Sequence, residues 1–195
     1  MSSSYIHPTA VVEPNAIVGS GVKVWHFCHV RQGAVLNQGV NLGKDVYVDE
    51  AVEIGENSRV QNGVSLYKGL EIAPWCFIGP HVIFTNDQSP RAGNTKWKVV
   101  PTKLRIGTSI GAGAIIRCGI ELGEFCMIGA GAIVTKDVPA FHLAMGVPAK
   151  IEKMICACGQ TQSELGSDKK LMIMDCCKTN LDPRALALAM KSVGL

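Results

Sequence analysis

The sequence predicts an all-β solenoid, in which short parallel strands coil around one aliphatic core. Three observations support this fold class. Aliphatic side chains recur every six residues along a chain of 195, glycine occurs 21 times, and only 6% of the residues are aromatic. A fixed aliphatic period fills one narrow interior, and glycines allow the sharp turns that return the chain to it. A chain of this length accommodates one such repeat domain and a small extension.

The six-residue period starts at Ile6 and runs through two blocks, with Phe84 as its one position that is not Val, Ile or Leu. The ladder positions are Ile6, Val12, Val18, Val24, Val30, Leu36, Leu42, Val48, Ile54, Val60, Leu66, Ile72, Ile78 and Phe84, then Leu104, Ile110, Ile116, Leu122, Ile128 and Val134. A small or β-branched residue commonly stands four positions after each one. Two inward side chains then flank one outward side chain on a short strand, and the remaining residues turn. This pattern predicts a parallel β-solenoid.

The period stops between Phe84 and Leu104. The interrupting sequence, NDQSPRAGNTKWKVVPTK, is polar and carries Asn86, Asp87, Arg91 and Trp97. A long irregular insertion within a compact repeat is commonly functional. Its hydrogen-bonding, cationic and stacking side chains suit an anionic ligand. We therefore expect an inserted loop over residues 85–103 that contributes to a site.

After residue 150 the period ends. We expect residues 1–150 to form the repeat domain and residues 151–195 to form an extension with a short helix. In that extension Asp182 precedes Pro183 and the apolar segment RALALAMKSVGL, which is typical of a helix cap, a proline in the first turn and a terminal helix. We expect this segment to cover the open end of the solenoid, where strand edges are unpaired.

Four cysteines also lie in the extension: Cys156, Cys158, Cys176 and Cys177. Their arrangement resembles a zinc ribbon, but such ribbons use two C-x-x-C pairs, and the spacings C-x-C and C-C fit that pattern poorly. Reduced thiols are the simpler interpretation, and no metal is expected, although the sequence leaves zinc binding by these cysteines open.

The aliphatic, often glycine-flanked hexads resemble those of the hexapeptide-repeat acyltransferases over residues 6 to about 150. The resemblance implies a left-handed parallel β-helix of about seven coils and a homotrimer with acyl-CoA in the groove between adjacent subunits. The outward aliphatic pairs Ile115 with Ile133 and Ile17 with Val35 suit such an interface or groove.

A narrower resemblance rests on IGPHVIFTNDQSPR and on the segments VWHFCHV and VQNGVSLY. These are similar to acetyltransferases that modify the 3-amino group of nucleotide-linked sugars, most closely the UDP-2-acetamido-3-amino-2,3-dideoxyglucuronate N-acetyltransferases of surface-polysaccharide synthesis. Enzymes acting on dTDP-linked 3-amino sugars share the central element and remain an alternative, as does an O-acetyltransferase.

The resemblance implies acetyl-CoA as co-substrate and the following site. The catalytic candidates are Asn86, Asp87 and His81; the substrate-binding candidates are Asn86, Arg91, Tyr67 and Asn62; and the CoA-binding candidates are Gly111, Gly113, Gly129, Gly131, Lys136 and Lys150. Sugar acetyltransferases of this fold often carry a catalytic histidine in the loop, but this loop has none. An amine acceptor needs a general base less than an alcohol does, so the loop favours an amino sugar.

Two other classes of function stay open. One is a metalloenzyme resembling the γ-class carbonic anhydrases, although the five histidines lack the spacing such a site uses. The other is a non-catalytic binding solenoid, which does not explain a specialised loop. The formal net charge is only +3, and no run of like-charged residues is longer than two. Neither nucleic acid nor a membrane surface is therefore an expected partner. Without an apolar span or an export signal, we expect a cytoplasmic location.

Overall fold

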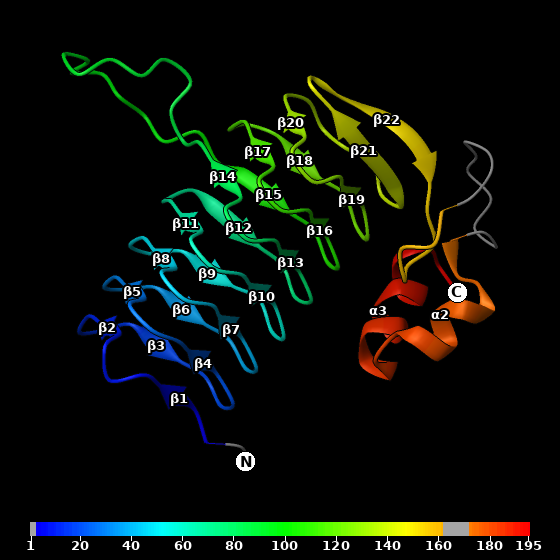
Figure 1. Ribbon diagram of the computed structural model, residues 1–195, viewed down its shortest axis with the longest axis horizontal. Coiled ribbons are helices and arrows are strands. Elements are labelled where there is room, and N and C mark those ends of the chain that lie inside the picture. Colours follow the sequence, from blue (N-terminus) through cyan, green and yellow to red (C-terminus); the bar gives the residue numbers. More distant parts are fainter. Residues whose placement is uncertain (1–2, 162–171) are drawn as a thin grey trace.

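The computed structural model describes residues 3–161 and 172–195, and its first part winds into a three-sided solenoid (Figure 1). Sheet 1 contains β1 (Tyr5–Ile6), β4 (Lys23–Val24), β7 (Asn41–Leu42), β10 (Arg59–Val60), β13 (Phe77–Ile78), β16 (Ser109–Ile110), β19 (Met127–Ile128), β21 (His142–Gly146) and β22 (Ala149–Met154). Sheet 2 contains β2 (Val11–Val12), β5 (His29–Val30), β8 (Tyr47–Val48), β11 (Ser65–Leu66), β14 (Ile83–Phe84), β17 (Ile115–Ile116) and β20 (Ile133–Val134). Sheet 3 contains β3 (Ile17–Val18), β6 (Val35–Leu36), β9 (Glu53–Ile54), β12 (Leu70–Ile72), β15 (Thr102–Leu104) and β18 (Glu121–Leu122).

Strands β1 to β17 each pair in parallel with the strand one coil later, usually eighteen residues on. Tyr5 lies beside Lys23, for example. Where the inserted segment intervenes, Ile83 instead pairs with Ile115, and the register continues unchanged beyond it. The predicted parallel β-solenoid is confirmed, and its three-sided coils are consistent with a left-handed β-helix.

The ladder residues from Val24 onward point inward and form one continuous core. Nearly all of them are less than 2% exposed, including Phe84, which fills the position where the sequence departs from aliphatic residues. Of the described residues, the buried polar ones are Ser58, Thr102 and Thr108, and each is hydrogen bonded: Ser58 Oγ donates to Ala73 O at 3.1 Å, Thr108 Oγ1 donates to Arg105 O at 2.8 Å, and Thr102 Oγ1 accepts from Gly119 N at 3.2 Å. Each buried hydroxyl is therefore paired with a backbone group of a neighbouring turn.

The three corners are named here by the sheets they join: 1–2, 2–3 and 3–1. One residue of each turn commonly adopts a positive φ, which is easy for glycine and unfavourable for other residues. At corner 3–1 this position is nevertheless aromatic in three coils, with φ of 62° at Trp75, 51° at Phe125 and 57° at Phe141. We infer that these rings bury enough surface to offset the backbone strain.

The C-terminal residues supply the cover for that corner. After the antiparallel pair β21–β22, the chain forms α2 (Asp175–Asn180) and α3 (Pro183–Ser192), drawn in orange and red in Figure 1. The Phe125 and Phe141 rings stack at 5.5 Å and pack with Ala189 and Val193. Arg184 lies 5.2 Å from the centre of the Trp75 ring, in cation–π contact.

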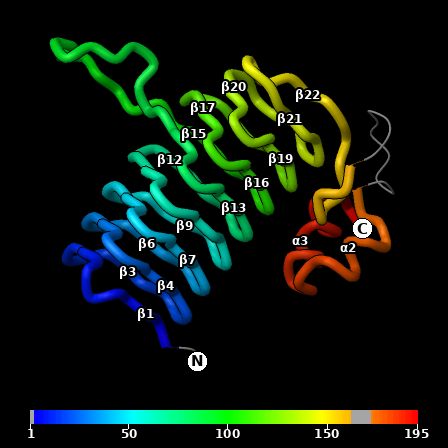
Figure 2. Tube along the Cα trace, viewed as in Figure 1, coloured from blue at the N-terminus to red at the C-terminus, as the bar shows by residue number. Residues whose placement is uncertain are grey.

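The predicted terminal helix is confirmed, with Asp182 Oδ1 accepting from Arg184 N at 2.9 Å at its start. Its expected place was wrong. The helix lies beside corner 3–1 and does not cover the end of the solenoid, as the chain trace in Figure 2 also shows. Its apolar residues Ala189 and Val193 pack on the Phe125 and Phe141 rings of that corner. Neither described helix is long and apolar enough to cross a membrane.

Replacing Phe125 with alanine should loosen α3 without affecting the distant coils. Removing a buried phenylalanine ring commonly costs about 3 kcal/mol, so amide hydrogen exchange in α3 should accelerate strongly while β8 and β11 stay protected. Phe27→Ala is the matched control, because Phe27 has the same backbone conformation (φ 57°) but is 58% exposed. Equal exchange in α3 for both variants would contradict this account of the corner.

Candidate active site

The inserted segment leaves the solenoid at corner 2–3, between β14 and β15, and projects away from the coils (Figure 1). A backbone hydrogen bond from Val100 N to Asn86 O, at 2.9 Å, closes its root. Asn86 Nδ2 donates to the carbonyl of Lys68 on the preceding coil at 3.3 Å. Among the described residues no donor reaches Asn86 Oδ1, so this half-buried amide keeps an acceptor for a ligand.

The outer part of the segment carries the predicted charged residues. Asp87 Oδ1 accepts from Ser89 N at 2.8 Å, which fixes the turn after the root. Arg91 is exposed and donates from Nη1 to Pro90 O at 2.9 Å, and no described carboxylate pairs with it. Trp97 is 48% exposed. A guanidinium without a carboxylate partner, in the same segment as an exposed indole, suits an anionic ligand with a flat ring.

Tyr67 lies at the same corner, one coil before the root of the segment. It directly precedes Lys68, whose carbonyl accepts from Asn86, and its ring is 6.1 Å from that of Tyr47. Lys68 Nζ in turn pairs with Glu50 at 2.7 Å. The structure therefore brings together Tyr67 and Asn86, two predicted substrate-binding residues, at corner 2–3.

A polar ladder on the outer face of sheet 2 continues from this corner, and sequence reasoning missed it. His29 Nε2 lies 2.7 Å from Glu13 Oε1, and Arg31 Nη1 donates to Asp49 Oδ1 at 3.1 Å. Tyr47 donates its hydroxyl to the same Asp49 oxygen at 3.1 Å. An eighteen-residue spacing of outward positions was the signal that would have found it.

Asp49 is the hub of this ladder. Burial opposes ionisation of its carboxyl, but the backbone N–H groups of Glu50 and Lys68, together with Tyr47 and Arg31, outweigh burial and hold the pKa of Asp49 below its usual value. The carboxylate therefore stays charged near neutral pH and fixes Tyr47 against Tyr67. The result is an ordered polar and aromatic surface beneath the inserted segment.

His81 and Asn62 occupy a different corner, 1–2. His81 adopts a φ of 57° and donates its N–H to Asn62 O at 3.0 Å, and its ring covers Gly63. Asn62 Oδ1 accepts from Lys44 N at 2.9 Å, so this amide already closes a turn. Asn62 also lines a shallow cavity of about 290 Å³ with Trp25 and His26, far from the root of the segment.

The predicted CoA-binding glycines fall into two kinds. A Cβ on Gly111 would lie 2.5 Å from Ala130 N, and a Cβ on Gly129 would lie 2.8 Å from Met145 Cβ, so both glycines are needed for close packing between coils. Gly113 and Gly131 have φ of 67° and 68°, and a Cβ there would meet nothing within 4 Å. The last two therefore leave open space along corner 1–2.

The two predicted lysines lie on different corners. Lys136 follows β20 at corner 2–3, and Lys150 lies on β22 opposite Met145, near the corner 1–2 end of sheet 1. β22 also runs across residue 150, where the sequence was expected to change from repeat to extension.

The candidate residues thus form two groups on opposite edges of sheet 2. Corner 2–3 holds Tyr67, Asn86, Asp87, Arg91 and Lys136, whereas corner 1–2 holds Asn62, His81, Gly113, Gly131 and Lys150. His81 and Asn86 are separated by β14, and five extended residues span roughly 15 Å. Between the corners, Ile83, Ile115 and Ile133 stack outward, and Ile83 is 51% exposed.

Comparison with known proteins identifies the family to which this repeat belongs. Residues 28–68 and 106–136 match the family model described as the hexapeptide repeat of succinyl-transferase. A dTDP-3-amino-3,6-dideoxy-α-D-galactopyranose 3-N-acetyltransferase of Aneurinibacillus thermoaerophilus is 38% identical over 162 residues, covering 81% of this chain and 84% of the relative.

The chain belongs to the hexapeptide-repeat acyltransferases. The prediction of an acetyltransferase enzyme is confirmed.

Solved structures agree on the fold of this acyltransferase. A maltose O-acetyltransferase from Clostridium difficile 630 aligns with a TM-score of 0.54 and 26% identity, over 60% of this chain and 66% of that one. A hexapeptide-repeat acetyltransferase from Vibrio cholerae, solved with acetyl-CoA, aligns with a TM-score of 0.50 and 23% identity, over 60% and 71% of the two chains.

The metalloenzyme alternative has no support from the histidines of this acyltransferase. His7 stacks on His26 at 3.5 Å, and His29 is bound to Glu13. In the described part of the chain, the one group of three or more metal-ligating side chains is the set of four cysteines in the C-terminal extension. That set lies beyond β22, away from the inserted segment.

Replacing Asn86 with alanine should lower kcat/KM at least about tenfold, because a substrate no longer held in line reacts more slowly. The measurement is CoA release by the purified enzyme at matched protein concentration. Asn94→Ala is the matched control, since Asn94 lies in the outer part of the same segment and its side chain accepts only from Lys96 N at 2.9 Å. Turnover of Asn86→Ala equal to that of the control would remove Asn86 from the mechanism.

Proposed function

We propose that this acyltransferase moves an acetyl group from acetyl-CoA to the 3-amino group of a nucleotide-linked sugar. The observation that carries the proposal is the amide of Asn86, held at the root of an inserted segment that has cationic and aromatic side chains but no histidine. The 38% identical relative from A. thermoaerophilus, named for the same type of reaction, supports it.

In the proposed reaction, the sugar amine attacks the carbonyl carbon of the acetyl thioester. A C–N bond forms, the carbonyl oxygen becomes an oxyanion held by a backbone N–H, and the C–S bond then breaks to release CoA as a thiol. Asn86 Oδ1 accepts from the amine and orients its lone pair. The amine's excess proton leaves to the CoA sulfur, directly or through water, Asp87 or His81.

The absence of a histidine from the segment favours an amine over an alcohol. An alcohol must lose its proton to a base during attack, whereas a fraction of an amine is already neutral near pH 7–8. Asp87 is bound within its own turn, and the inserted segment itself contains no histidine. An acceptor that needs little proton abstraction fits this arrangement best.

The separation of the two groups of residues implies that the site is shared between subunits. Asn86 on corner 2–3 and the open glycines of corner 1–2 lie too far apart to meet one acetyl group within one chain. The inserted segment points away from its own coils (Figure 1). A segment that projects in this way can reach a neighbouring solenoid. We therefore propose a homotrimer in which corner 2–3 of one subunit faces corner 1–2 of the next, with CoA along Gly113, Gly131 and Lys150.

Two sugar nucleotides fit the proposal. The A. thermoaerophilus relative supports a dTDP-linked 3-amino-deoxy sugar. The exposed Arg91 guanidinium supports UDP-2-acetamido-3-amino-2,3-dideoxyglucuronate as the second candidate, because a carboxylate would accept two parallel hydrogen bonds from it. Either product would serve the assembly of a surface polysaccharide.

A panel of acceptors tests the function. Purified enzyme with acetyl-CoA should release CoA with at least one of the two 3-amino sugar nucleotides and not with their 3-hydroxy counterparts. The rate should rise with pH, about tenfold per unit, while the acceptor amine is mostly protonated. Turnover with a 3-hydroxy sugar or maltose, and none with any amine, would contradict the proposal.

A further inference from the structure

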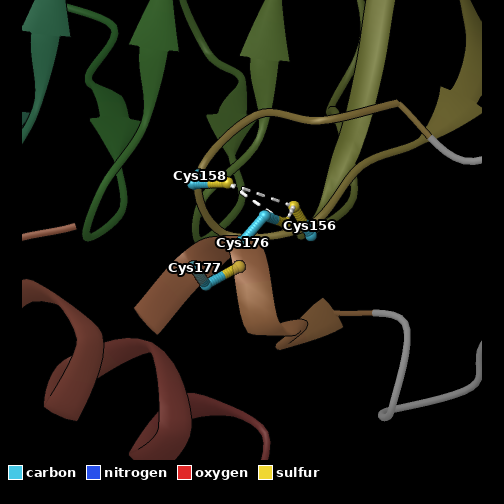
Figure 3. Close-up of side chains that lie close together, drawn as sticks. All are labelled: Cys156, Cys158, Cys176 and Cys177. Carbon is cyan, nitrogen blue, oxygen red and sulfur yellow. Dashed lines mark hydrogen bonds between the residues drawn. The ribbon is translucent and has the colours of Figure 1, made fainter. Parts of the chain in front are cut away.

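The C-terminal extension contains a second chemical site, made of four cysteines. Cys156 and Cys158 follow β22, and Cys176 and Cys177 lie in the first turn of α2 (Figure 3). Their four sulfur atoms lie within 4.8 Å of one another. Two segments separated by seventeen residues thus bring their cysteine sulfurs, which are soft metal ligands, close together.

The distances between these sulfurs fit a single tetrahedral ion. Cys156 Sγ is 3.5 Å from Cys158 Sγ and 3.6 Å from Cys176 Sγ, and the Cys158–Cys176 distance is also 3.6 Å. Zinc–thiolate bonds of about 2.3 Å in a tetrahedron place neighbouring sulfurs about 3.8 Å apart. Three sulfurs therefore already form one nearly equilateral face, with Cys177 beside it.

Other uses of four clustered cysteines fit less well. A disulfide requires a sulfur–sulfur distance of about 2.05 Å, well below the distances between these atoms. Four sulfurs within 4.8 Å enclose the space of one ion and not that of a cluster of several irons. Four thiolates without oxygen ligands favour zinc over magnesium or calcium.

The local backbone explains how C-x-C and C-C converge despite their unusual spacing. Gly159 adopts a φ of 90°, its N–H donates to Cys156 O at 2.8 Å, and Cys156 N donates to Gln160 O at 3.0 Å. This tight reversal turns the sulfurs of Cys156 and Cys158 to the same side. At the other segment, Cys177 N donates to Met174 O at 2.9 Å and starts the turn of α2.

The site is also partly closed to solvent and has a hydrogen-bond donor at its edge. Cys156 and Cys177 are fully buried, whereas Cys158 and Cys176 are half-buried. Asn180 Nδ2 lies 3.9 Å from Cys158 Sγ and points a donor at the thiolate. Such outer contacts orient the ligands of structural metal sites.

We propose that Cys156, Cys158, Cys176 and Cys177 bind one Zn²⁺ ion that fastens the C-terminal helices to the solenoid. Binding converts each thiol to a thiolate and releases its proton to solvent. The ion ties the end of β22 to α2, and α3 then packs on Phe125 and Phe141 at corner 3–1. The helices lie on the opposite side of the molecule from the inserted segment in Figure 1, so the role is structural and independent of the acyl-transfer proposal.

Metal analysis of the full chain, purified under reducing conditions without chelator, tests this inference. Plasma mass spectrometry should find about one zinc per chain, the occupancy expected of a tight structural site. Cys158→Ala and Cys176→Ala should each reduce zinc to less than half of that. Cys118→Ala is the matched control, because Cys118 is a buried cysteine of the solenoid outside the cluster, and it should retain the wild-type zinc content.

A second measurement keeps the inference testable if a variant fails to fold. Wild-type protein stripped of metal and given Co²⁺ should gain the visible absorption of tetrahedral thiolate-bound cobalt, and hydrogen exchange in α3 should slow again. Two of the solenoid thiols are poor competitors, since burial raises the pKa of Cys76 and of Cys126 to about 12. Background zinc with no cobalt spectrum, iron in place of zinc, a disulfide among the four cysteines, or unchanged zinc in both cluster variants would overturn the proposal.

Discussion

Hydrogen bonding between successive coils is the constraint on which the rest of this protein depends. Each coil donates and accepts backbone hydrogen bonds in register with the next, as in Tyr5 N to Val22 O at 2.8 Å and Ser109 N to Cys126 O at 2.9 Å. Because the register is eighteen residues, a residue's place in that period decides its sheet or corner. The inserted segment lengthens one coil without disturbing the pairing on either side, since Ile83 and Ile115 are still neighbours.

That constraint also decides what the active site can be. It holds Tyr67, Asn86 and the polar ladder around Asp49 near one edge of sheet 2, and the open glycines near the other edge. No movement of a rigid coil brings the two edges together. A second solenoid could bring the two groups of residues together, if its corner 1–2 lay beside the first solenoid's inserted segment. This separation is the reason for proposing that catalysis takes place between subunits.

Much of the fold followed from the period alone. The ladder positions predicted the buried face of nearly every strand, and the break after Phe84 predicted the inserted segment, because inward side chains obey simple geometry. The corners were harder. Nothing in the local sequence indicates that Trp75, Phe125 and Phe141 adopt a left-handed backbone, since the packing of α3 compensates for that strain.

The site residues divide in the same way. Asn86 and Tyr67 were recognisable by motif, but their separation from His81 appears only once the coils are stacked. The usual rule for zinc-binding cysteines expects two residues between the members of a pair, as in C-x-x-C. Here the chain reversal at Gly159 brings Cys156 and Cys158 together although only one residue separates them. Gly111 and Gly129 show another limit of sequence reasoning. A glycine required for close packing between coils cannot be distinguished in the sequence from a glycine that makes room for a ligand.

The proposed active site joins corner 2–3 of one subunit to corner 1–2 of the next. Co-expression of an Asn86→Ala chain with a Gly131→Trp chain tests it, since Phe27 shows that an exposed aromatic side chain is tolerated on corner 1–2 at a φ of 57°. Each variant alone should be nearly inactive. Random mixing should restore about one quarter of the wild-type sites, because a heterologous interface then pairs an intact edge from each chain. Activity no higher than that of the separate variants would show that both edges must belong to one chain, and would contradict the account.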